Sequence, residues 1–455
     1  MSEPAAPSLP QPGAAAPLRR SWWMPGPLAL PAAGLFLAVA LAASWNPDLD
    51  SWWRGLGYCL LALALVDALW LRILPLPRVR RRHAHALALG VDSEVRLELT
   101  PPGKTALHLR VYDHHPLDCE VEGLPQSLRL AGHSATLSYR LRPIHRGELK
   151  FGPVELQLAS PLGFWRQRIH ADLDEPVRVY PNFAALAGYV LLATDHRLSQ
   201  AGVLQRRRRG EGLDFHQLRE YREGDAPRQI DWKASSRMRR LISREYRDER
   251  DQQILLLLDC GRRMHARDGD LSHLDHALNS ALLLAQVALR QGDAVGLMTF
   301  GGVDRYLPPR KSQAAINHLL AESFDLQATL SPPDYYAAAV KLMQRQRKRS
   351  LVILISNLRD EDDDTLQPAV SLLRRRHLVV LASLREQILD AALSHPIGDL
   401  DAALTHAATA QYLDARRRAF ARLEQARIPC LDVEPQALPI ALINRYTELK
   451  RRGSI

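Results

Sequence analysis

The sequence predicts a multidomain protein: an N-terminal transmembrane helical hairpin, a small antiparallel β-sandwich and a C-terminal α/β domain with a doubly wound parallel sheet. Three observations predict this order: two uncharged apolar runs, then short strands of alternating polarity, then apolar strands that alternate with helical segments. With 455 residues, a hydrophobic fraction of 46% and a net charge of +10, the chain is neither fibrous nor wholly disordered. Its four scattered cysteines predict no zinc finger and no disulfide scaffold.

The N-terminal part is divided into a disordered tail, residues 1–23, and two transmembrane helices within residues 24–76. Residues 27–45 carry no charge and would span roughly 29 Å as a helix, enough to cross a hydrocarbon core. A second apolar run covers residues 55–74, and six of the eight tryptophans lie at or near the ends of these runs, as in an interfacial aromatic belt. A cleaved signal peptide is the competing interpretation of the first run.

The orientation of the hairpin follows from the basic residues that flank it. Two cations precede the first run, and four follow the second: Arg19 and Arg20, then Arg78, Arg80, Arg81 and Arg82. The positive-inside rule therefore predicts that both termini and the soluble domains are cytoplasmic. Asp67 lies inside the second run and is interpreted as partly solvated near Arg72 and the interface; a helix–helix or proton-relay contact is the alternative.

A small antiparallel β-sandwich is expected over residues 85–182. Four runs alternate apolar and polar side chains: 95–99, 106–111, 135–141 and 154–158. The turn sequence 100–104 is expected to join the first two runs as a hairpin. Gly103-Lys104-Thr105 resembles the end of a phosphate loop, but the first glycine of that motif is replaced by Glu98, so no ATP site is expected.

Residues 183–250 form a charged segment, for which an ion-pair network is predicted. Between 201 and 250 there are fourteen Lys or Arg and nine Asp or Glu residues, and arginine can hold a carboxylate with two hydrogen bonds. The residues expected in this network are Asp214, His216, Arg219, Tyr221, Gly224, Asp225, Arg228, Asp231, Trp232 and Lys233. Three interpretations remain for the basic run Arg206, Arg207, Arg208 and Arg209: a lipid-headgroup site, a solvated loop, or nucleic-acid binding, which is not expected because no interleaved aromatic residues accompany it.

The α/β domain is assigned to residues 251–455. Strands are predicted at 253–258, 294–300, 351–356, 378–381 and 430–433, and helices at 272–291, 334–349, 366–376 and 438–451. Ser272 and Asp275 have the spacing of a capping box. Ligands of such a sheet bind beyond the carboxyl ends of its strands, and without a G-x-G-x-x-G motif no dinucleotide is expected.

The charged segment carries a family resemblance. Residues 212–237, GLDFHQLREYREGDAPRQIDWKASSR, and residues 243–259, SREYRDERDQQILLLLD, closely resemble the signature of the domain of unknown function 58 family. The resemblance covers residues 24–450. It implies a bacterial inner-membrane protein with two spans, a von Willebrand factor type A-like C-terminal domain and an association with MoxR-type AAA ATPases.

The von Willebrand-type fold builds a metal site from a D-x-S-x-S motif, a distant threonine and a distant aspartate, oxygen ligands that suit a hard divalent ion. In this chain Asp259 remains, whereas the other positions are occupied by Gly261, Arg263, Pro333 and Asn357. No metal and no cofactor are therefore expected, and an arginine paired with Asp259 is expected to replace the ion. The acidic run 360–364 could attract a cation, but Asp363 or Asp364 is expected to cap the next helix.

The resulting expectation is a membrane-anchored, non-enzymatic interaction scaffold at the cytoplasmic face, acting with a MoxR-type ATPase in the assembly or maturation of other proteins. The candidate docking residues are Arg262, Arg263, Asp360 and Asp362. One alternative is an envelope protein that binds anionic lipid or polymer. A second is a metal-dependent hydrolase that uses Asp214, His216 and Asp231.

Overall fold

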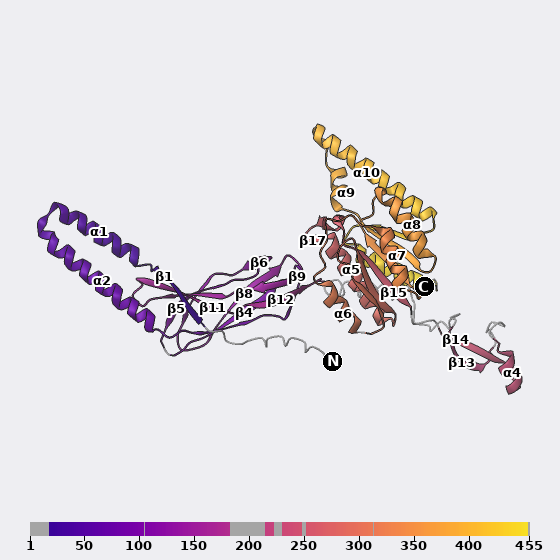
Figure 1. Cartoon of the computed structure of the whole chain (residues 1–455), viewed down its shortest axis with the longest axis horizontal. Helices are drawn as coiled ribbons and strands as arrows, with labels where there is room; N and C mark the ends of the chain where they lie inside the picture. Colours follow the sequence, from indigo (N-terminus) through magenta and orange to yellow (C-terminus); the bar gives the residue numbers. More distant parts are fainter. Residues whose placement is uncertain are drawn as a thin grey trace. The chain divides into compact units, whose positions relative to one another are not determined.

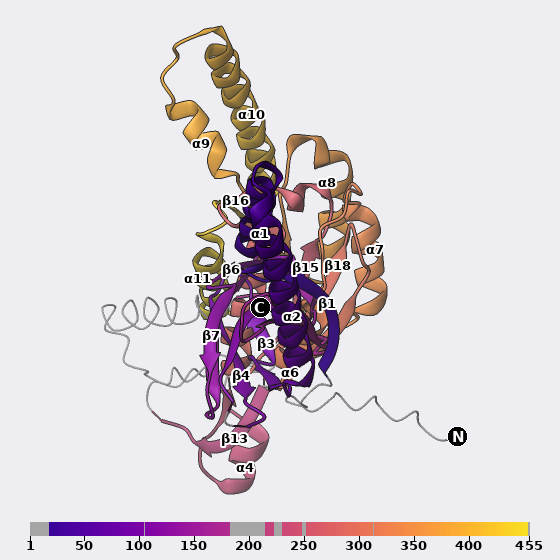
Figure 2. The ribbon, with the colours of Figure 1, turned by 90° about the vertical axis from the view of Figure 1, so that its left-hand side faces the viewer.

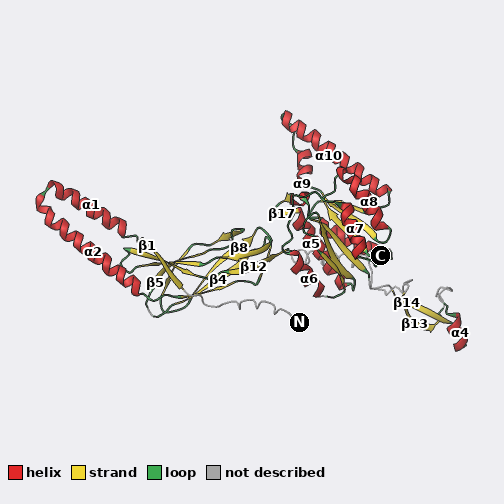
Figure 3. Cartoon of the chain, in the orientation of Figure 1, coloured by secondary structure: helices red, strands yellow, loops and turns green. Residues whose placement is uncertain are grey.

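The structure is a computed structural model that describes residues 18–182 except 104, residues 214–222 and 230–247, and residues 252–453 except 313. The chain divides into two compact units, Met1–Tyr180 and Pro181–Ile455. The first unit contains helices and sheets of mostly antiparallel strands, and the second contains a mostly parallel sheet covered by helices (Figures 1 and 3).

The first unit begins with two apolar helices, α1 (Ala29–Trp45) and α2 (Asp50–Ile73), joined by the short helix η1 (Pro47–Leu49). The helices pack against each other: the rings of Phe36 and Trp53 stack with centroids 5.5 Å apart, and a Cβ on Gly57 would lie 3.0 Å from the Phe36 ring. Within the described residues, α2 is the one helix long and apolar enough to cross a membrane, and α1 is a shorter apolar helix.

The residues that flank the helices belong to the β part of the unit. Strand β1 (Leu18–Pro25) pairs with β11 (Trp165–Ala171), and β2 (Arg78–Arg82) pairs with β4 (Ser93–Thr100), both antiparallel. The disordered tail expected over residues 1–23 is therefore wrong at residues 18–23, where the backbone of β11 supplies hydrogen-bond partners; residues 1–17 lie outside the described part. The β region also begins before residue 85, since β2 contributes to it.

Three sheets make up the β region, in the orders β1-β11-β10-β5-β7, β2-β4-β8-β6 and β3-β12-β9. Burial alternates along most strands, so one face of each is directed to a core. The remaining strands are β3 (Ala86–Ala88), β5 (Leu107–Asp113), β6 (Cys119–Glu122), β7 (Gln126–Leu130), β8 (Ala135–Pro143), β9 (Gly147–Phe151), β10 (Val154–Ala159) and β12 (Glu175–Tyr180). Strands β4 and β5 lie in different sheets, so the hairpin predicted at 100–104 is wrong: this segment links two sheets.

A buried ion pair lies in the core of this unit. The side chains of Arg81 and Asp113 are both fully buried and in contact, and Arg81 also donates to the backbone oxygens of Gly152 (2.7 Å) and Leu173 (2.5 Å). The Tyr139 hydroxyl donates to Asp113 at 2.7 Å, and burial together with this carboxylate raises the tyrosine pKa. Arg81 is therefore not a cation of the flanking surface, unlike its exposed neighbours at 78, 80 and 82.

Asp67 joins α2 to the β region. Its buried carboxylate accepts hydrogen bonds from Ser160 Oγ (2.5 Å), the Leu162 amide (2.9 Å) and the Phe164 amide (3.0 Å), all in the turn between β10 and β11. We call these four residues the Asp67 latch. The interpretation of Asp67 as partly solvated near Arg72 is wrong, because the turn 160–164 covers the carboxylate and supplies its donors.

Further bonds hold the base of the two helices beside the latch. The Trp165 indole donates to the Ala64 oxygen at 2.9 Å, and Arg20 of β1 donates to the oxygen of Leu74, at the end of α2, at 2.5 Å. The Gly26 amide donates to the Phe164 oxygen at 2.7 Å, and a Cβ on Gly26 would lie 2.1 Å from the Gly163 oxygen, so no larger residue fits there. The helices and the β region are thus bonded at several points.

The second unit contains a two-stranded antiparallel sheet, β13 (Asp214–Glu220) with β14 (Ile242–Arg247), and the helix α4 (Trp232–Met238). Its main part is a sheet in the order β19-β18-β15-β20-β21-β22, parallel except for the edge strand β19. The strands of this sheet are β15 (Gln253–Asp259), β18 (Ala294–Phe300), β19 (Tyr306–Arg310), β20 (Leu351–Ser356), β21 (Leu378–Leu384) and β22 (Cys430–Val433). This order is doubly wound: β18 lies on one side of β15, whereas β20, β21 and β22 follow on the other side. The strand order therefore reverses between β15 and β20.

Helices cover both faces of this sheet (Figure 2). Alternate residues of β15 face opposite cores: Ile254, Leu256 and Leu258 pack with α5 and α11, whereas Leu255 and Leu257 pack with α7 and α8. The helices are α5 (His273–Arg290), α6 (Ala314–Ser323), α7 (Tyr335–Arg345), α8 (Asp363–Arg374), α9 (Gln387–Ser394), α10 (Leu400–Gln425) and α11 (Leu438–Arg451). The capping box of Ser272 and Asp275 is present at the start of α5, as predicted.

Candidate functional site

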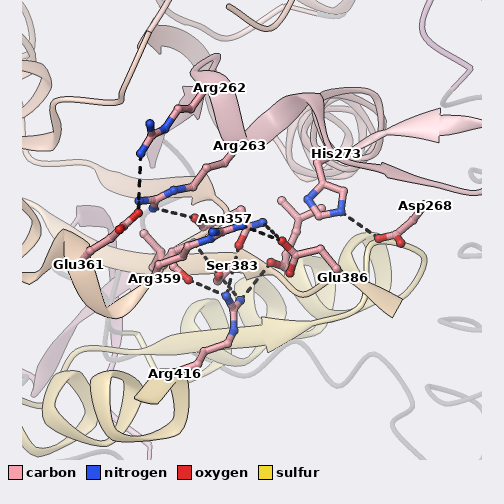
Figure 4. Close-up of polar contacts among 12 residues, drawn as sticks. Arg262, Arg263, Asp268, His273, Asn357, Arg359, Glu361, Ser383, Glu386 and Arg416 are labelled. Atoms are coloured by element: carbon pink, nitrogen blue, oxygen red, sulfur yellow. Dashed lines mark hydrogen bonds and ion pairs between the residues drawn. The ribbon is translucent and has the colours of Figure 1, made fainter. Parts of the chain in front are cut away.

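The candidate site lies where the carboxyl ends of β15, β20, β21 and β22 meet. Figure 4 shows side chains of this site, among them Arg263, Asn357 and Arg416. Loops and short elements after these strands supply its side chains: η3 (Arg262–His265) after β15, η4 (Asp360–Asp362) after β20, and the start of α9 after β21. Helix α10 then adds one buried arginine. The reversal of strand order between β15 and β20 is the position at which open α/β sheets bind ligands.

Asp259 ends β15 and is completely buried. One carboxylate oxygen accepts from Ser356 Oγ (2.6 Å) and the other from the Gly261 amide (2.7 Å), while the Tyr335 hydroxyl lies 2.9 Å from Ser356 Oγ. Burial raises the pKa of Asp259 to about 6. Protein groups therefore already contact both carboxylate oxygens of Asp259.

A side chain at position 261, where the metal motif would carry a serine, would be crowded. A Cβ there would lie 3.0 Å from Asp259 Oδ1, 3.0 Å from the Ser331 oxygen and 3.2 Å from Pro333 Cδ, which is tighter than ordinary contacts. In the part of the chain that the structure describes, no group of three or more His, Cys, Asp or Glu side chains is placed to hold a metal. The residues present do not suit a hard divalent ion, and we continue to expect none.

Arg263 is buried beside this site but does not pair with Asp259. Its guanidinium contacts Asp362 and Glu361, and its Nη1 donates to the Asn357 oxygen at 3.3 Å. The expected arginine–Asp259 pair is wrong, because the carboxylates of η4 lie within reach of this guanidinium. The helix cap expected at Asp363 or Asp364 is also wrong: Asp362 occupies the N-cap position of α8 but makes no capping hydrogen bond, and its carboxylate accepts instead from the Arg359 amide.

Arg416 of α10 organises the ends of the other three strands. Its side chain is 2% exposed and donates to Asp432 (2.7 Å), Ser383 Oγ (2.7 Å), Asn357 Oδ1 (3.2 Å) and the oxygens of Leu358 (2.5 Å) and Leu384 (3.0 Å). These acceptors come from β21, β22 and the two residues that follow β20. One guanidinium thus hydrogen-bonds to the carboxyl ends of three of the six strands.

Asn357, which follows β20, belongs to this bonded cluster. Its amide nitrogen donates to Glu386 Oε1 at 2.6 Å, and its oxygen accepts from Arg416. Asn357 is completely buried. The residue therefore acts as a structural bridge between β20 and the start of α9.

A buried histidine connects the cluster to α9. His273 Nε2 lies 2.9 Å from Asp268 Oδ2, and the other oxygen of Asp268 accepts from the Gln387 amide at 3.3 Å. Both side chains are buried. This contact fixes the first turn of α9 against the body of the domain.

Beyond the cluster, α9 and the first turns of α10 project from the α/β body (Figures 1 and 2). Residues 385–408 include no buried side chain, and Ile388, Ile397, Leu400 and Leu404 are each more than half exposed. Residues 387–411, which we call the α9–α10 hairpin, contain three aspartates and neither lysine nor arginine. The accessible surface beside the cluster is therefore apolar and acidic.

The candidate docking residues are only partly accessible. Arg262 and Glu361 are both exposed, 3.9 Å apart, whereas Arg263 and Asp362 are buried in their ion pair. The prediction that Arg263 and Asp362 present their charges to a partner is wrong, because each neutralises the other. The side chain of Asp360 lies outside what the structure describes.

The charged segment is described in part. Asp231 caps α4 by accepting from the Ala234 amide at 3.0 Å, and Arg240 pairs with Glu220 of β13. Trp232 and Lys233 are exposed, and Arg219 and Tyr221 lie at the end of β13 and just after it. Asp214 and His216 lie on β13, but their side chains are outside the described part. The same part excludes the whole of Gly224, Asp225, Arg228 and the basic run Arg206–Arg209.

Titration of Asp259 predicts a pH dependence. Its folded pKa of about 6 lies above the ordinary value of 3.8, so the folded state holds the extra proton, and the free energy of unfolding falls as pH rises through this window. Between pH 5 and 7 we expect a loss of about 1 kcal/mol from this group. Hydrogen exchange of the β15 and β20 amides would measure the loss.

Asp259→Asn is the matched variant, because Ser356 Oγ can accept from the new amide. This variant should lack the pH-dependent loss. Millimolar Mg²⁺ should change the stability of neither protein, because no ion is expected to bind at Asp259. An ion bound there would stabilise the charged carboxylate and restore the lost stability at pH 7. Equal pH profiles in both proteins, or such a restoration, would contradict the prediction.

Taken together, the fold and cluster define a doubly wound α/β domain whose strand-end site is filled by arginine–carboxylate contacts. Residues 217–426 match a family model described as "Protein of unknown function DUF58". The chain is also similar to the uncharacterized protein YeaD of Bacillus subtilis (strain 168), with 24% identity over 223 residues, 45% of this chain and 51% of that protein. The chain thus spans about half the length of this curated relative. The match to the family model includes the strand-end cluster from Asp259 to Arg416.

Proposed function

We propose that this chain is a membrane-anchored, non-enzymatic scaffold that binds a protein partner through a von Willebrand factor type A-like domain. Helix α2, with α1 beside it, would form two membrane spans with both termini in the cytoplasm. The resemblance of the charged segment to its family makes a MoxR-type AAA ATPase the proposed partner, in the assembly or maturation of other proteins.

One observation carries the proposal. At the position where such sheets bind ligands, Arg416 and Arg263 already neutralise the carboxylates and contact the polar ends of the strands, while the accessible neighbour is the α9–α10 hairpin. Exposed apolar side chains on a projecting element are typical of protein–protein contacts. We therefore place the partner on this hairpin, beside Arg262 and Glu361.

The experiment measures affinity between the full chain, held in lipid nanodiscs, and the purified ATPase. Leu400→Ser with Leu404→Ser should weaken binding by at least about tenfold, since two apolar anchors are lost. Leu117→Ser is the matched control, because this leucine is 95% exposed in the first unit, and it should bind as the unchanged chain does.

Two further outcomes bear on the same proposal. Arg262→Glu should reduce the association rate, because a charge at the rim of the contact acts mainly through steering. Arg263→Glu is not a useful docking variant, since it would place a third carboxylate against Asp362 and Glu361 and disturb the loop itself. Unchanged affinity in the double leucine variant would remove the partner from the hairpin.

A further inference from the structure

The amino edge of the α/β sheet is strongly basic. Three successive connections reach this edge, before β20, β21 and β22, which are neighbours in the sheet. We call their eight exposed cations the basic edge: Arg345, Arg347, Lys348, Arg349, Arg374, Arg375, Arg376 and Arg427. The connecting segments 345–350, 374–377 and 426–429 contain no Asp or Glu.

The three connections lie close together. Arg376 donates to the Met343 oxygen of α7 at 3.3 Å, and Arg374 donates to the Ala426 oxygen beside Arg427 at 2.7 Å. Among the described residues, only Arg345 of these eight contacts a carboxylate, that of Asp304 at 3.3 Å. The cations therefore form one patch rather than three separate groups.

Helix ends do not account for this charge. A helix C-terminus carries about half a negative charge and attracts cations only within its last turn. Arg345 and Arg374 lie in the last turns of α7 and α8, but the other six residues lie beyond the helices. The positive charge at the basic edge thus greatly exceeds what the helix dipoles offset.

We propose that the basic edge binds the headgroups of anionic phospholipids. This inference rests on the proposed membrane anchoring, which keeps the domain near a bilayer. Anionic lipids bind clustered Lys and Arg without apolar anchors, each cation contributing a factor of about five to the binding constant.

The composition of the patch favours lipid over other anionic partners. The three connecting segments hold no Phe, Tyr or Trp on which nucleotide bases could stack. Their exposed positions offer none of the aromatic or large apolar residues that dominate protein interfaces. Binding at this edge would direct the opposite edge, with the α9–α10 hairpin, away from the bilayer and toward a soluble partner.

The test uses the full chain in nanodiscs of phosphatidylcholine alone or mixed with phosphatidylglycerol. A fluorophore is attached at Gln344→Cys, in the exposed last turn of α7, after Cys59 and Cys430 are changed to serine. Headgroup-linked quenchers should quench it several-fold more in the anionic discs. The difference should disappear in about 1 M salt, where the Debye length is about 3 Å.

Lys348→Glu with Arg375→Glu should lower the binding constant for the anionic surface by at least about 25-fold, since two cations are lost and two anions are added. The matched control, Arg267→Glu with Arg417→Glu, reverses two exposed cations outside the basic edge and should keep the quenching. Circular dichroism would first show whether both variants fold as the unchanged chain does. If the Lys348/Arg375 variant does not, Arg347→Gln with Arg376→Gln would replace it.

The outcomes separate this inference from the proposed function. Failure of the chain to enter nanodiscs would refute the anchoring and the inference together. If the chain enters nanodiscs but is quenched equally in both disc types, the lipid site alone is refuted. The same holds if the control variant loses as much quenching as the Lys348/Arg375 variant. Salt-sensitive binding of a single-stranded RNA that the Lys348/Arg375 variant loses, without lipid-dependent quenching, would assign the patch to nucleic acid instead.

Discussion

Replacing Arg416 with alanine is expected to lower the free energy of unfolding of the α/β domain by about 3–5 kcal/mol. The guanidinium is buried and holds five acceptors from three strand ends, among them the Asp432 carboxylate. Without it, that carboxylate and the oxygens of Asn357 and Ser383 lose their charged donor while remaining within the cluster. Hydrogen exchange of the β20, β21 and β22 amides in the full chain would measure the change.

The neighbouring arginine gives a matched control. Arg417 is exposed and pairs with Asp414 within the same helix, so Arg417→Ala should change the free energy of unfolding by less than about 0.5 kcal/mol. Arg416→Lys should recover only part of the lost stability. A single ammonium nitrogen cannot donate to all the acceptors that the planar guanidinium contacts with its three nitrogens. Equal exchange in the Arg416 and Arg417 variants would show that the strand ends are held in another way.

The sequence around Arg416 carries a signal for its burial. Arg416 lies three residues after Leu413 and four before Phe420, within the stripe of α10 that packs on the sheet. Charge alone could not separate it from Arg417 and Arg418, which follow it directly. Its helical spacing could have done so, had α10 been predicted.

The central strands were predictable because each is a short, continuous apolar run covered on both faces. Strand β20 begins and ends at the predicted residues 351 and 356, and β18 at 294 and 300. Strand β19 was missed because Pro308 and Pro309 interrupt it, which an edge strand tolerates. The α9–α10 hairpin was missed although α9 carries its apolar side chains on one side, because no residue from 385 to 408 is buried in a core.

The contacts of the strand-end cluster could not be predicted from the sequence. The comparison of residues 259–263 and 357 with a metal motif drew attention to the strand ends, where the structure places Asp259, Arg263 and Asn357. The sequence did not show that Arg263 would pair with residues 361 and 362, about a hundred positions later, rather than with Asp259. Partner choice among several nearby charges depends on loop geometry, which composition and spacing do not specify.

Replacing Asp67 with alanine is expected to weaken the attachment of α2 to the β region by about 3 kcal/mol. The variant leaves the amides of Leu162 and Phe164 without their charged acceptor, and Ser160 loses its partner as well. Faster hydrogen exchange at residues 162 and 164, with little change in the strands β4 and β8, would be the result. Asp67→Asn should give a similar loss, because its amide nitrogen faces donors rather than acceptors.

Asp50→Ala is the control, since Asp50 is an exposed carboxylate on the same helix whose partner is Arg54, four residues later. It should leave exchange at residues 162 and 164 unchanged. If the Asp67 variants did the same, the bonds from Trp165 and Arg20 would suffice to hold the helix. If instead exchange rises as expected, the carboxylate at position 67 and the Trp165 bond to Ala64 together mark the part of α2 that contacts protein. Only the residues from Asp50 to Leu63 would then be left for a bilayer. Such a segment is shorter than a usual membrane-crossing helix, and the local bilayer would have to thin to accommodate it.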